Sequence, residues 1–448
     1  TVSKARPHIL AKIWNKSMLS LRERLFLLII AGFLILGNLP RFLPMPTAFG
    51  NVNLSEVLLY AISLLIFPIR SFSIFRTSLG VTLILGTVFS TCVGLLKWGI
   101  DFTALVYSSR LLIQITIAHL VAGILAEKLY SPQNLIVRNY LLTYTAMAAI
   151  AIALLILFPN STDLWKTLSS FGVEFAGDPH INRLVSLYFD PNFYATIIVL
   201  PTIIALHGAL SEKKLSYIAS SALLILTLFL TVSRSGISLL FLIAIGYAIL
   251  QSPRLHLIKL PQIILPAVPL LIFSLSTATL LSFEQVERLA MRLAQGLGDG
   301  SSTARFESFS LGLRLMEDEF LLGYGYNFAL SFIRESGRNG IDSSLQLFFL
   351  TYGALPATII LIIFAIKFYI IDRNLRQISN TPTLPSLTSA HVLWRIVASY
   401  FVMTLLWAAH FNQVLFYPFW LIPTLAFIFL FERVSDNHVR QCQRTDLF

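Results

Sequence analysis

The sequence predicts an all-α polytopic membrane protein with about 12 transmembrane helices. Of its 448 residues, 56% are hydrophobic and only 12% are charged, whereas soluble proteins carry about 25% charged residues. Apolar stretches close to the roughly 20 residues that a helix needs to cross a bilayer recur along the whole chain. These two observations exclude a soluble globular protein.

The apolar stretches divide the chain into one transmembrane domain, residues 25–432, between two terminal segments. Residues 1–24 are basic and moderately amphipathic, and we expect them to lie at the cytoplasmic interface rather than to be a removed signal peptide. Residues 433–448 form a cytoplasmic tail. The predicted spans are approximately 25–40, 54–69, 77–97, 102–125, 139–158, 192–210, 216–233, 236–252, 260–281, 343–368, 391–411 and 415–432.

The distribution of basic residues orients these spans. Twelve spans place both termini on one side, and that side carries 21 of the 33 Lys and Arg residues, against 11 on the other side. Positively charged loops stay in the cytoplasm. Both termini are therefore predicted to be cytoplasmic.

Two connections on the outer side are too long to be simple turns. They comprise residues 159–191 and 282–342, and long loops of this kind are usually functional. The second loop has helical periodicity over 284–297 and 303–318, and we expect these helices to lie along the membrane surface as a lid. The sequence contains no internal repeat, which disfavours an inverted-repeat transporter.

Two arginines stand out on the outer side of the protein. Arg234 ends an apolar stretch within Ser233-Arg234-Ser235-Gly236, and Arg305 opens the second helix of the long loop. A charge kept at the edge of hydrocarbon is costly and indicates function. A guanidinium grips phosphate oxygens with two parallel hydrogen bonds and never loses its charge. Two of them favour a diphosphate ligand; the alternative is a pair of arginines that anchor helix ends at the interface.

Asp342 is the third candidate catalytic residue. It ends the long loop just before an apolar span, so it would face the two arginines as a general base or as an anchor for a sugar hydroxyl. The alternative is an N-cap, because a carboxylate at a helix N-terminus is favoured by the peptide dipoles.

Further polar residues are candidates for substrate binding on the outer side. Asp190 and Asn192 flank a proline where the first long loop meets a span, and His180 and Arg183 lie just upstream. The Asp-Pro-Asn segment also fits a plain turn and helix cap. Arg110 lies about 12 Å into its span at 1.5 Å per residue, where it should face protein or a wet cavity.

A polar turn, His410 to Gln413, connects the last two spans and includes Asn412. We interpret it as a solvated turn on the outer side of the membrane.

Other chemistries find no support in the sequence. The eight histidines are isolated, and no spacing typical of metal ligands is present. The sequence also lacks the Walker A motif that binds ATP. Cys92 and Cys442 imply no disulfide framework. The net charge of +11 is scattered through short loops, which does not indicate nucleic-acid binding. We therefore expect a reaction without metal or cofactor on an already activated substrate.

Four short motifs together resemble the O-antigen ligase and polymerase superfamily of bacterial inner membranes. They are Asp190-Pro191-Asn192, Ser233-Arg234-Ser235-Gly236, Arg305 followed by Leu322-Gly323-Tyr324-Gly325, and Leu345-Gln346 followed by Tyr352-Gly353. The resemblance implies a glycosyltransferase of the C type, with its active site facing the periplasm. It also implies that Arg234 and Arg305 bind a lipid-linked diphosphate, and it adds Tyr324 to the substrate-binding candidates.

One position departs from the ligase pattern. Ligases of this superfamily usually carry His-Asn at the start of the span after the long loop, where this chain reads Ile341-Asp342. The aspartate is more similar to the polymerase branch. The resemblance therefore favours polymerisation of oligosaccharide repeat units linked to undecaprenyl diphosphate.

Two other functions stay open. The first is a ligase that transfers the finished glycan to lipid A-core or to a protein. The second, from another class, is a transporter of lipid-linked oligosaccharides or small anions. The implied partners are the undecaprenyl-diphosphate-linked donor, a glycan or lipid A-core acceptor, membrane lipids, a chain-length regulator and a flippase.

Overall fold

The computed structural model describes residues 20–39, 57, 59–63, 77–126, 135–170, 180–251, 300–337, 340–379 and 385–445. These residues form helices and loops, with one isolated bridge between Asn160 and Ile181. The helices used below are α2 (Leu21–Leu36), α5 (Ser78–Trp98), α6 (Phe102–Ala126), α7 (Leu135–Leu157), α8 (Ser161–Ser169), α9 (Pro191–Glu212), α10 (Leu215–Leu230), α11 (Arg234–Gln251), α14 (Gly300–Asp318), α15 (Ala329–Glu335), α16 (Ser344–Tyr352), α17 (Ala354–Ser379), α18 (Pro385–Leu406) and α19 (Pro418–Thr445).

The all-α membrane architecture is confirmed. Within the described residues, 7 helices are long and apolar enough to cross a membrane, and two shorter apolar helices cover Leu215–Leu230 and Arg234–Gly246. The predicted span 260–281 and most of 54–69 lie outside the described residues. The total of twelve spans therefore stays a prediction.

The prediction of one continuous helix over 343–368 is wrong. The helix is interrupted at Gly353, whose φ of +76° separates α16 from α17. The loop after α14 packs against the break: Tyr324 N donates to Leu350 O at 2.7 Å, and Ala354 N donates to Phe320 O at 2.7 Å. A side chain at Gly353 would collide with the backbone of Leu322. Glycine is thus required here because two backbones meet.

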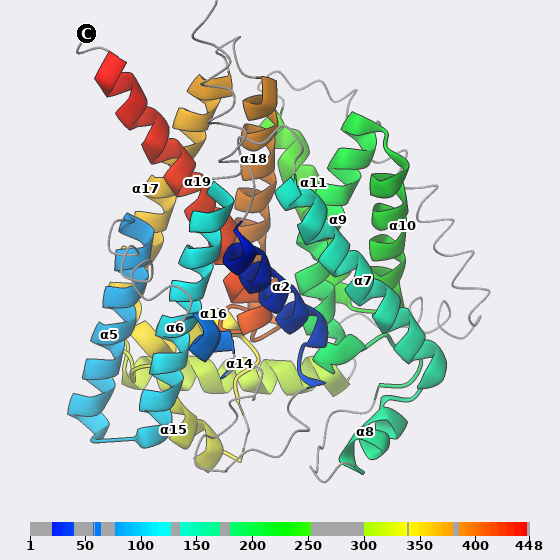
Figure 1. Ribbon diagram of the computed structural model, residues 1–448. Coiled ribbons are helices and arrows are strands. Elements are labelled where there is room, and N and C mark those ends of the chain that lie inside the picture. The colour runs from blue at the N-terminus through cyan, green and yellow to red at the C-terminus, as the bar shows by residue number, and fades with distance from the viewer. Residues whose placement is uncertain are drawn as a thin grey trace, which may run out of the picture.

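The described part of the second long loop contains two helices, α14 and α15. The helix expected over 303–318 is α14, whereas the one expected over 284–297 lies outside the described residues. In Figure 1, α14 lies crosswise to the long helices and across one end of the bundle. This orientation agrees with a helix that lies on a membrane surface.

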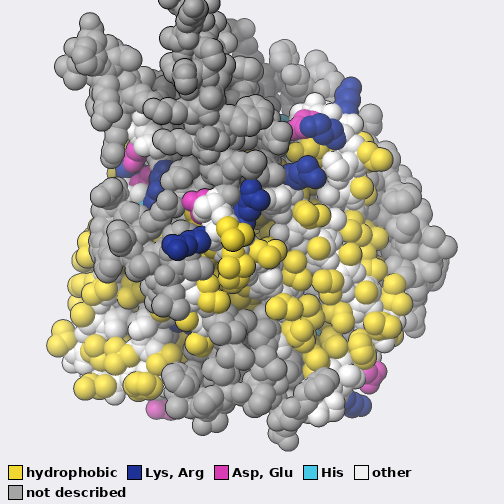
Figure 2. All heavy atoms as spheres, viewed as in Figure 1, with side chains coloured by type: hydrophobic (Ala, Val, Ile, Leu, Met, Phe, Trp, Pro, Cys, Tyr) yellow, Lys and Arg dark blue, Asp and Glu magenta, His cyan; other side chains and the backbone are white. Residues whose placement is uncertain are grey.

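The bundle is built around α19. In the most apolar 18-residue stretch of α19, 89% is buried, whereas the corresponding share for α17 is 22%. Helix α19 is therefore central and α17 is peripheral. It packs along α6 and also contacts α17 and α18. Hydrophobic side chains are exposed over much of the face in Figure 2, as expected for helices that face lipid.

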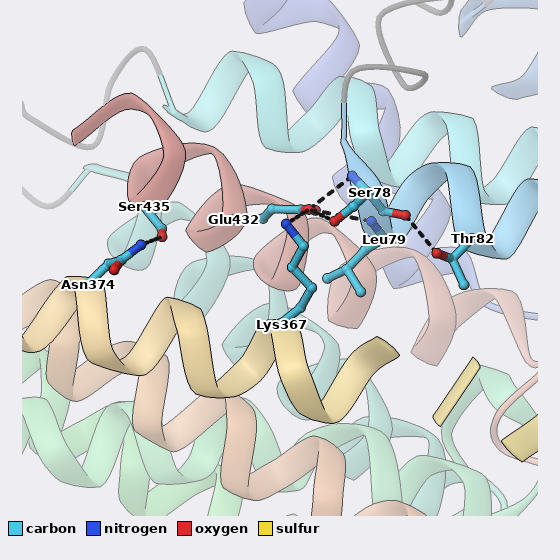
Figure 3. Close-up of polar contacts among 7 residues, drawn as sticks. All are labelled: Ser78, Leu79, Thr82, Lys367, Asn374, Glu432 and Ser435. Carbon is cyan, nitrogen blue, oxygen red and sulfur yellow. Dashed lines mark hydrogen bonds and ion pairs between the residues drawn. The ribbon is translucent and has the colours of Figure 1, made fainter. Parts of the chain in front are cut away.

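A buried carboxylate joins α19 to two other helices. Glu432 on α19 is 0% exposed; its Oε1 accepts hydrogen bonds from Ser78 N at 3.1 Å and from Ser78 Oγ at 2.8 Å at the start of α5 (Figure 3). Lys367 Nζ on α17 lies 3.7 Å from the same oxygen. We call Glu432, Ser78 and Lys367 the Glu432 cluster; it lies at the end of the bundle where α5 begins.

Candidate functional site

Arg234 begins α11 directly after a tight turn. Val232, in this turn, has a φ of +52°, a strained conformation for a β-branched residue. The turn is held on both sides: Ser233 N donates to Thr231 Oγ1 at 3.1 Å, and Arg183 Nε donates to Thr231 O at 2.9 Å. Strain persists only where the surroundings over-determine the conformation. Arg183 from the first long loop therefore fixes the backbone that positions Arg234.

A chain of hydrogen bonds joins the first turns of three helices. Ser233 Oγ donates to Asn192 Oδ1 at 2.9 Å, and Ser233 and Ser235 share a contact of 3.3 Å between their hydroxyls. Asn412 Nδ2 donates to Ser235 Oγ at 3.2 Å, and Ser344 Oγ donates to Asn412 O at 2.7 Å. We call these five residues the polar network. They hold together the N-termini of α9, α11 and α16, at what we call the site end of the bundle.

The meeting of three helix N-termini sets the electrostatics of the site end. Each N-terminus carries a partial positive charge from its aligned peptide groups and attracts anions. Arg234 adds a full positive charge at the start of α11. The polar network itself is made of hydroxyls and amides and carries no charge, but the carboxylate of Asp190 caps the first amides of α9 and Asp342 lies just before α16. The positive potential that could attract an anionic ligand is therefore concentrated at the start of α11, where Arg234 lies.

Asp342 lies at the junction of α14 and α16, but it is not the N-cap of α16. The cap is Ser343, whose Oγ accepts from Gln346 N at 3.2 Å. The Asp342 backbone N donates to Ser308 Oγ on α14 at 2.9 Å. The N-cap alternative is therefore wrong, because Asp342 stands one residue before the capping position.

Arg305 lies on the face of α14 that contacts α16. Gln346 Nε2 donates to Phe309 O at 2.9 Å, and a side chain at Gly312 would collide with Gln346. Arg305 precedes Ser308 and Phe309 by about one turn, so it shares their face. Its side chain is half-buried, and in the part of the chain that the structure describes its guanidinium has no hydrogen bond or ion pair.

The Asp-Pro-Asn segment is confirmed as a turn and helix cap. Asp190 Oδ1 accepts from Asn192 N at 2.6 Å and from Phe193 N at 3.0 Å, which caps α9. His180 is held further out, where its backbone N donates to Ser161 Oγ at 2.7 Å at the start of α8. A contact of Asp190, Asn192 or His180 with a sugar stays a prediction.

Tyr324 belongs to a hydrophobic cluster beside the site end. Its ring stacks on Trp98 at 5.5 Å between centroids and also contacts Phe332. Its side chain is 3% exposed, and burial raises the pKa of its hydroxyl. This environment gives Tyr324 of the Gly-Tyr-Gly segment a role in packing. A contact between Tyr324 and the substrate stays a prediction.

Arg110 lies within α6, where its guanidinium is 5.6 Å from the centre of the Tyr107 ring. A cation over an aromatic face is stabilised by the ring quadrupole. The role of Arg110 in substrate binding stays a prediction, because its contact with Tyr107 does not test it.

The prediction of a solvated turn at His410–Gln413 is wrong for Asn412. The residue is 6% exposed and bridges α11 and α16 through the polar network. Gln413 Nε2 donates to Ile341 O and so fixes the segment before α16. Polarity made this turn resemble a solvent-exposed loop, and only the packing of α16 against it reveals its role.

Comparison with known proteins adds an independent observation. A family model described as O-antigen ligase matches residues 219–351. This match supports the O-antigen ligase and polymerase superfamily. No curated protein matches the chain in a sequence search.

The matched region contains the three residues that the superfamily resemblance and the sequence single out for catalysis. Arg234, Arg305 and Asp342 all lie within residues 219–351. Asn192 and Asn412, which tie α11 and α16 into the bundle, lie outside it. Among the described residues, no group of three His, Cys, Asp or Glu side chains could hold a metal ion.

Proposed function

We propose that the protein is a glycosyltransferase that polymerises undecaprenyl-diphosphate-linked repeat units at the periplasmic face of a bacterial inner membrane. The product is a surface polysaccharide such as an O-antigen, capsule or exopolysaccharide. What carries the proposal is the set of hydrogen bonds that joins α11, α14 and α16, because Arg234 lies on α11, Arg305 lies on α14 and Asp342 directly precedes the N-cap of α16.

The two arginines bind the diphosphate of the donor. The donor glycan is attached to this diphosphate through its reducing end, and the bond between its anomeric carbon and the diphosphate oxygen breaks. Negative charge grows on the leaving diphosphate, and preorganised cations stabilise such charge strongly. The unpaired guanidinium of Arg305 in the described structure supports this assignment.

Asp342 acts on the acceptor. A non-reducing-end hydroxyl of the acceptor repeat unit attacks the anomeric carbon, and its proton passes to the Asp342 carboxylate. Direct displacement inverts the configuration of the anomeric carbon. The N-cap of α16 is supplied by Ser343, so the helix does not require the Asp342 side chain for capping.

The second candidate is a ligase, favoured by the description of the matching family. The donor and the departure of the diphosphate are the same in both reactions. Only the acceptor differs, because a ligase transfers the finished glycan to lipid A-core or to a protein hydroxyl.

The test supplies the purified protein in proteoliposomes with a synthetic undecaprenyl-diphosphate-linked repeat unit, with and without lipid A-core. Polymerisation yields a ladder of chain lengths and undecaprenyl diphosphate without lipid A-core. A ligase yields product only when lipid A-core is present. Donor that crosses the vesicle membrane without any new glycosidic bond would replace both functions with the transporter alternative.

A further inference from the structure

A groove lies between α2, α6, α7 and α19, away from the polar network. It has a volume of about 370 Å³, within the range of roughly 300–1,000 Å³ that is usual for small-molecule sites. Hydrophobic side chains such as Ala31, Leu34 and Phe427 form most of its wall. Arg24 and Asn139 are among the few polar side chains that line it.

The groove lies toward the end of the bundle opposite the site end. α6 reaches it with Val121 and Leu125, close to the end of the helix at Ala126, and α7 reaches it with its first turns, from Asn139. α7 then runs toward α8 and the loop that leads to the N-terminus of α9. The diphosphate proposed at the site end would therefore lie at the other end of these helices.

Polar and apolar residues are separated along the groove. On α2, Arg24 comes before Leu28 and Ala31; on α7, Asn139 comes before Leu142. The first turns of both helices thus provide a cation and an amide, and the following turns provide mainly hydrocarbon, with Thr143 as a further polar residue on α7. This order matches an amphiphile with an anionic head and an apolar chain.

The groove is open to the side of the bundle. Leu28 is 68% exposed and Leu142 is 65% exposed, so the two rims face the surroundings rather than the core. In the same view as Figure 1, Figure 2 shows Lys and Arg side chains in its upper half and mainly hydrophobic side chains below them. A ligand would enter sideways from the bilayer.

We propose that this groove binds an anionic glycerophospholipid from the bilayer leaflet at that end. One acyl chain lies along Ala31, Leu142 and Phe427, and the phosphodiester pairs with the guanidinium of Arg24. Basic pockets between transmembrane helices bind anionic lipid head groups in this way, and a guanidinium suits phosphate oxygens. The bound lipid fills the space between α2 and α7 and stabilises their packing on α19.

The experiment measures lipid binding by native mass spectrometry of the purified full chain. Phosphatidylglycerol and phosphatidylcholine with identical acyl chains are titrated separately. One lipid molecule should bind per protein, and phosphatidylglycerol should bind about fivefold more tightly than phosphatidylcholine. This difference in affinity is expected for one basic residue near a lipid head group. Arg24→Gln should abolish this preference. The matched control is Arg22→Gln, because Arg22 is exposed on the same helix but does not line the groove.

A second pair of variants tests the hydrocarbon part. Ala31→Trp fills the groove and should weaken binding of both lipids, whereas Leu25→Trp, at an exposed position of α2 outside the groove, should not. Equal effects of Arg22→Gln and Arg24→Gln would overturn the proposal, because the preference would then be a general effect of charge. Unchanged binding by the Ala31→Trp protein would overturn it as well.

Discussion

The two ends of the bundle use polar side chains in opposite ways. In the Glu432 cluster, a fully buried carboxylate meets the amides at the start of α5 and an ammonium from α17. In the polar network, hydroxyls and amides meet one another, and the charged residues Arg305 and Asp342 lie beside it. In the Glu432 cluster, opposite charges neutralise each other within the fold. At the site end, neutral hydroxyl and amide groups hold the helices together.

This difference distinguishes charges that serve structure from charges proposed to serve a reaction. A buried charge costs several kcal/mol unless it is paired, so Glu432 is held by partners on two helices. At the site end the neutral network holds the helices, and Arg234 and Arg305 are the charges that we propose to bind a ligand.

The comparison depends first on which end faces outward. In a protein with Cys92 and Cys442 replaced by serine, a single cysteine is introduced either by Gly300→Cys or by Asn437→Cys. Position 300 is at the start of α14, and position 437 is in the C-terminal part of α19. A membrane-impermeant maleimide should label intact spheroplasts at position 300 and not at 437, an all-or-none difference. The reverse pattern would place the site end in the cytoplasm and remove the proposed reaction.

Asp342→Asn should have the next largest effect. If the carboxylate accepts the proton of the acceptor, polymer formation should fall about 10²-fold, while the melting temperature stays unchanged because Ser343 caps α16. The control is Ser343→Ala, which should lower the free energy of unfolding by about 1 kcal/mol. Normal polymer formation by the Asp342→Asn protein would leave the residue without a chemical role.

Arg305→Ala should reduce the rate by at least about thirtyfold, since one charge-assisted contact of about 2 kcal/mol is lost. Arg305→Lys should be intermediate, because lysine keeps the charge but not the planar fork. Arg314→Ala is the matched control: Arg314 is exposed on α14 and lies about two and a half turns from Arg305, on the opposite face. Similar rates for the Arg305→Ala and Arg314→Ala proteins would show that position 305 does not bind the donor.

Glu432→Ala should change stability and leave the activity of the folded enzyme intact. Removing one partner of a buried ion pair costs roughly 3–5 kcal/mol, which thermal unfolding in detergent would detect. Glu212→Gln, in the exposed pair with Lys214, should cost less than about 1 kcal/mol. A Glu432→Ala protein with normal stability and impaired glycan formation would contradict the structural role of the cluster.

Much of the site was visible in the sequence, but its connections were not. Ser233-Arg234-Ser235-Gly236 and Asp190-Pro191-Asn192 drew attention as local motifs, and their hydroxyl and amide groups do meet. Asn412 was interpreted as solvent-exposed because its neighbours in sequence are polar and lie between two spans. Its burial comes from α16, which starts far upstream in the chain, so no local pattern could show it.

The sequence by itself determined the class of the protein and the residues with chemical potential. Apolar length and low charge require membrane helices, since backbone groups in lipid must be satisfied within a helix, and arginine and aspartate at the ends of spans indicate where charge is retained. The tertiary structure alone decided that the helix expected at 343–368 breaks at Gly353, because the backbone of the loop after α14 occupies the place of a side chain. It also decided that Ser343 rather than Asp342 caps α16. The break at Gly353 depends on contacts between segments distant in sequence, and such contacts leave no periodic signal in either segment.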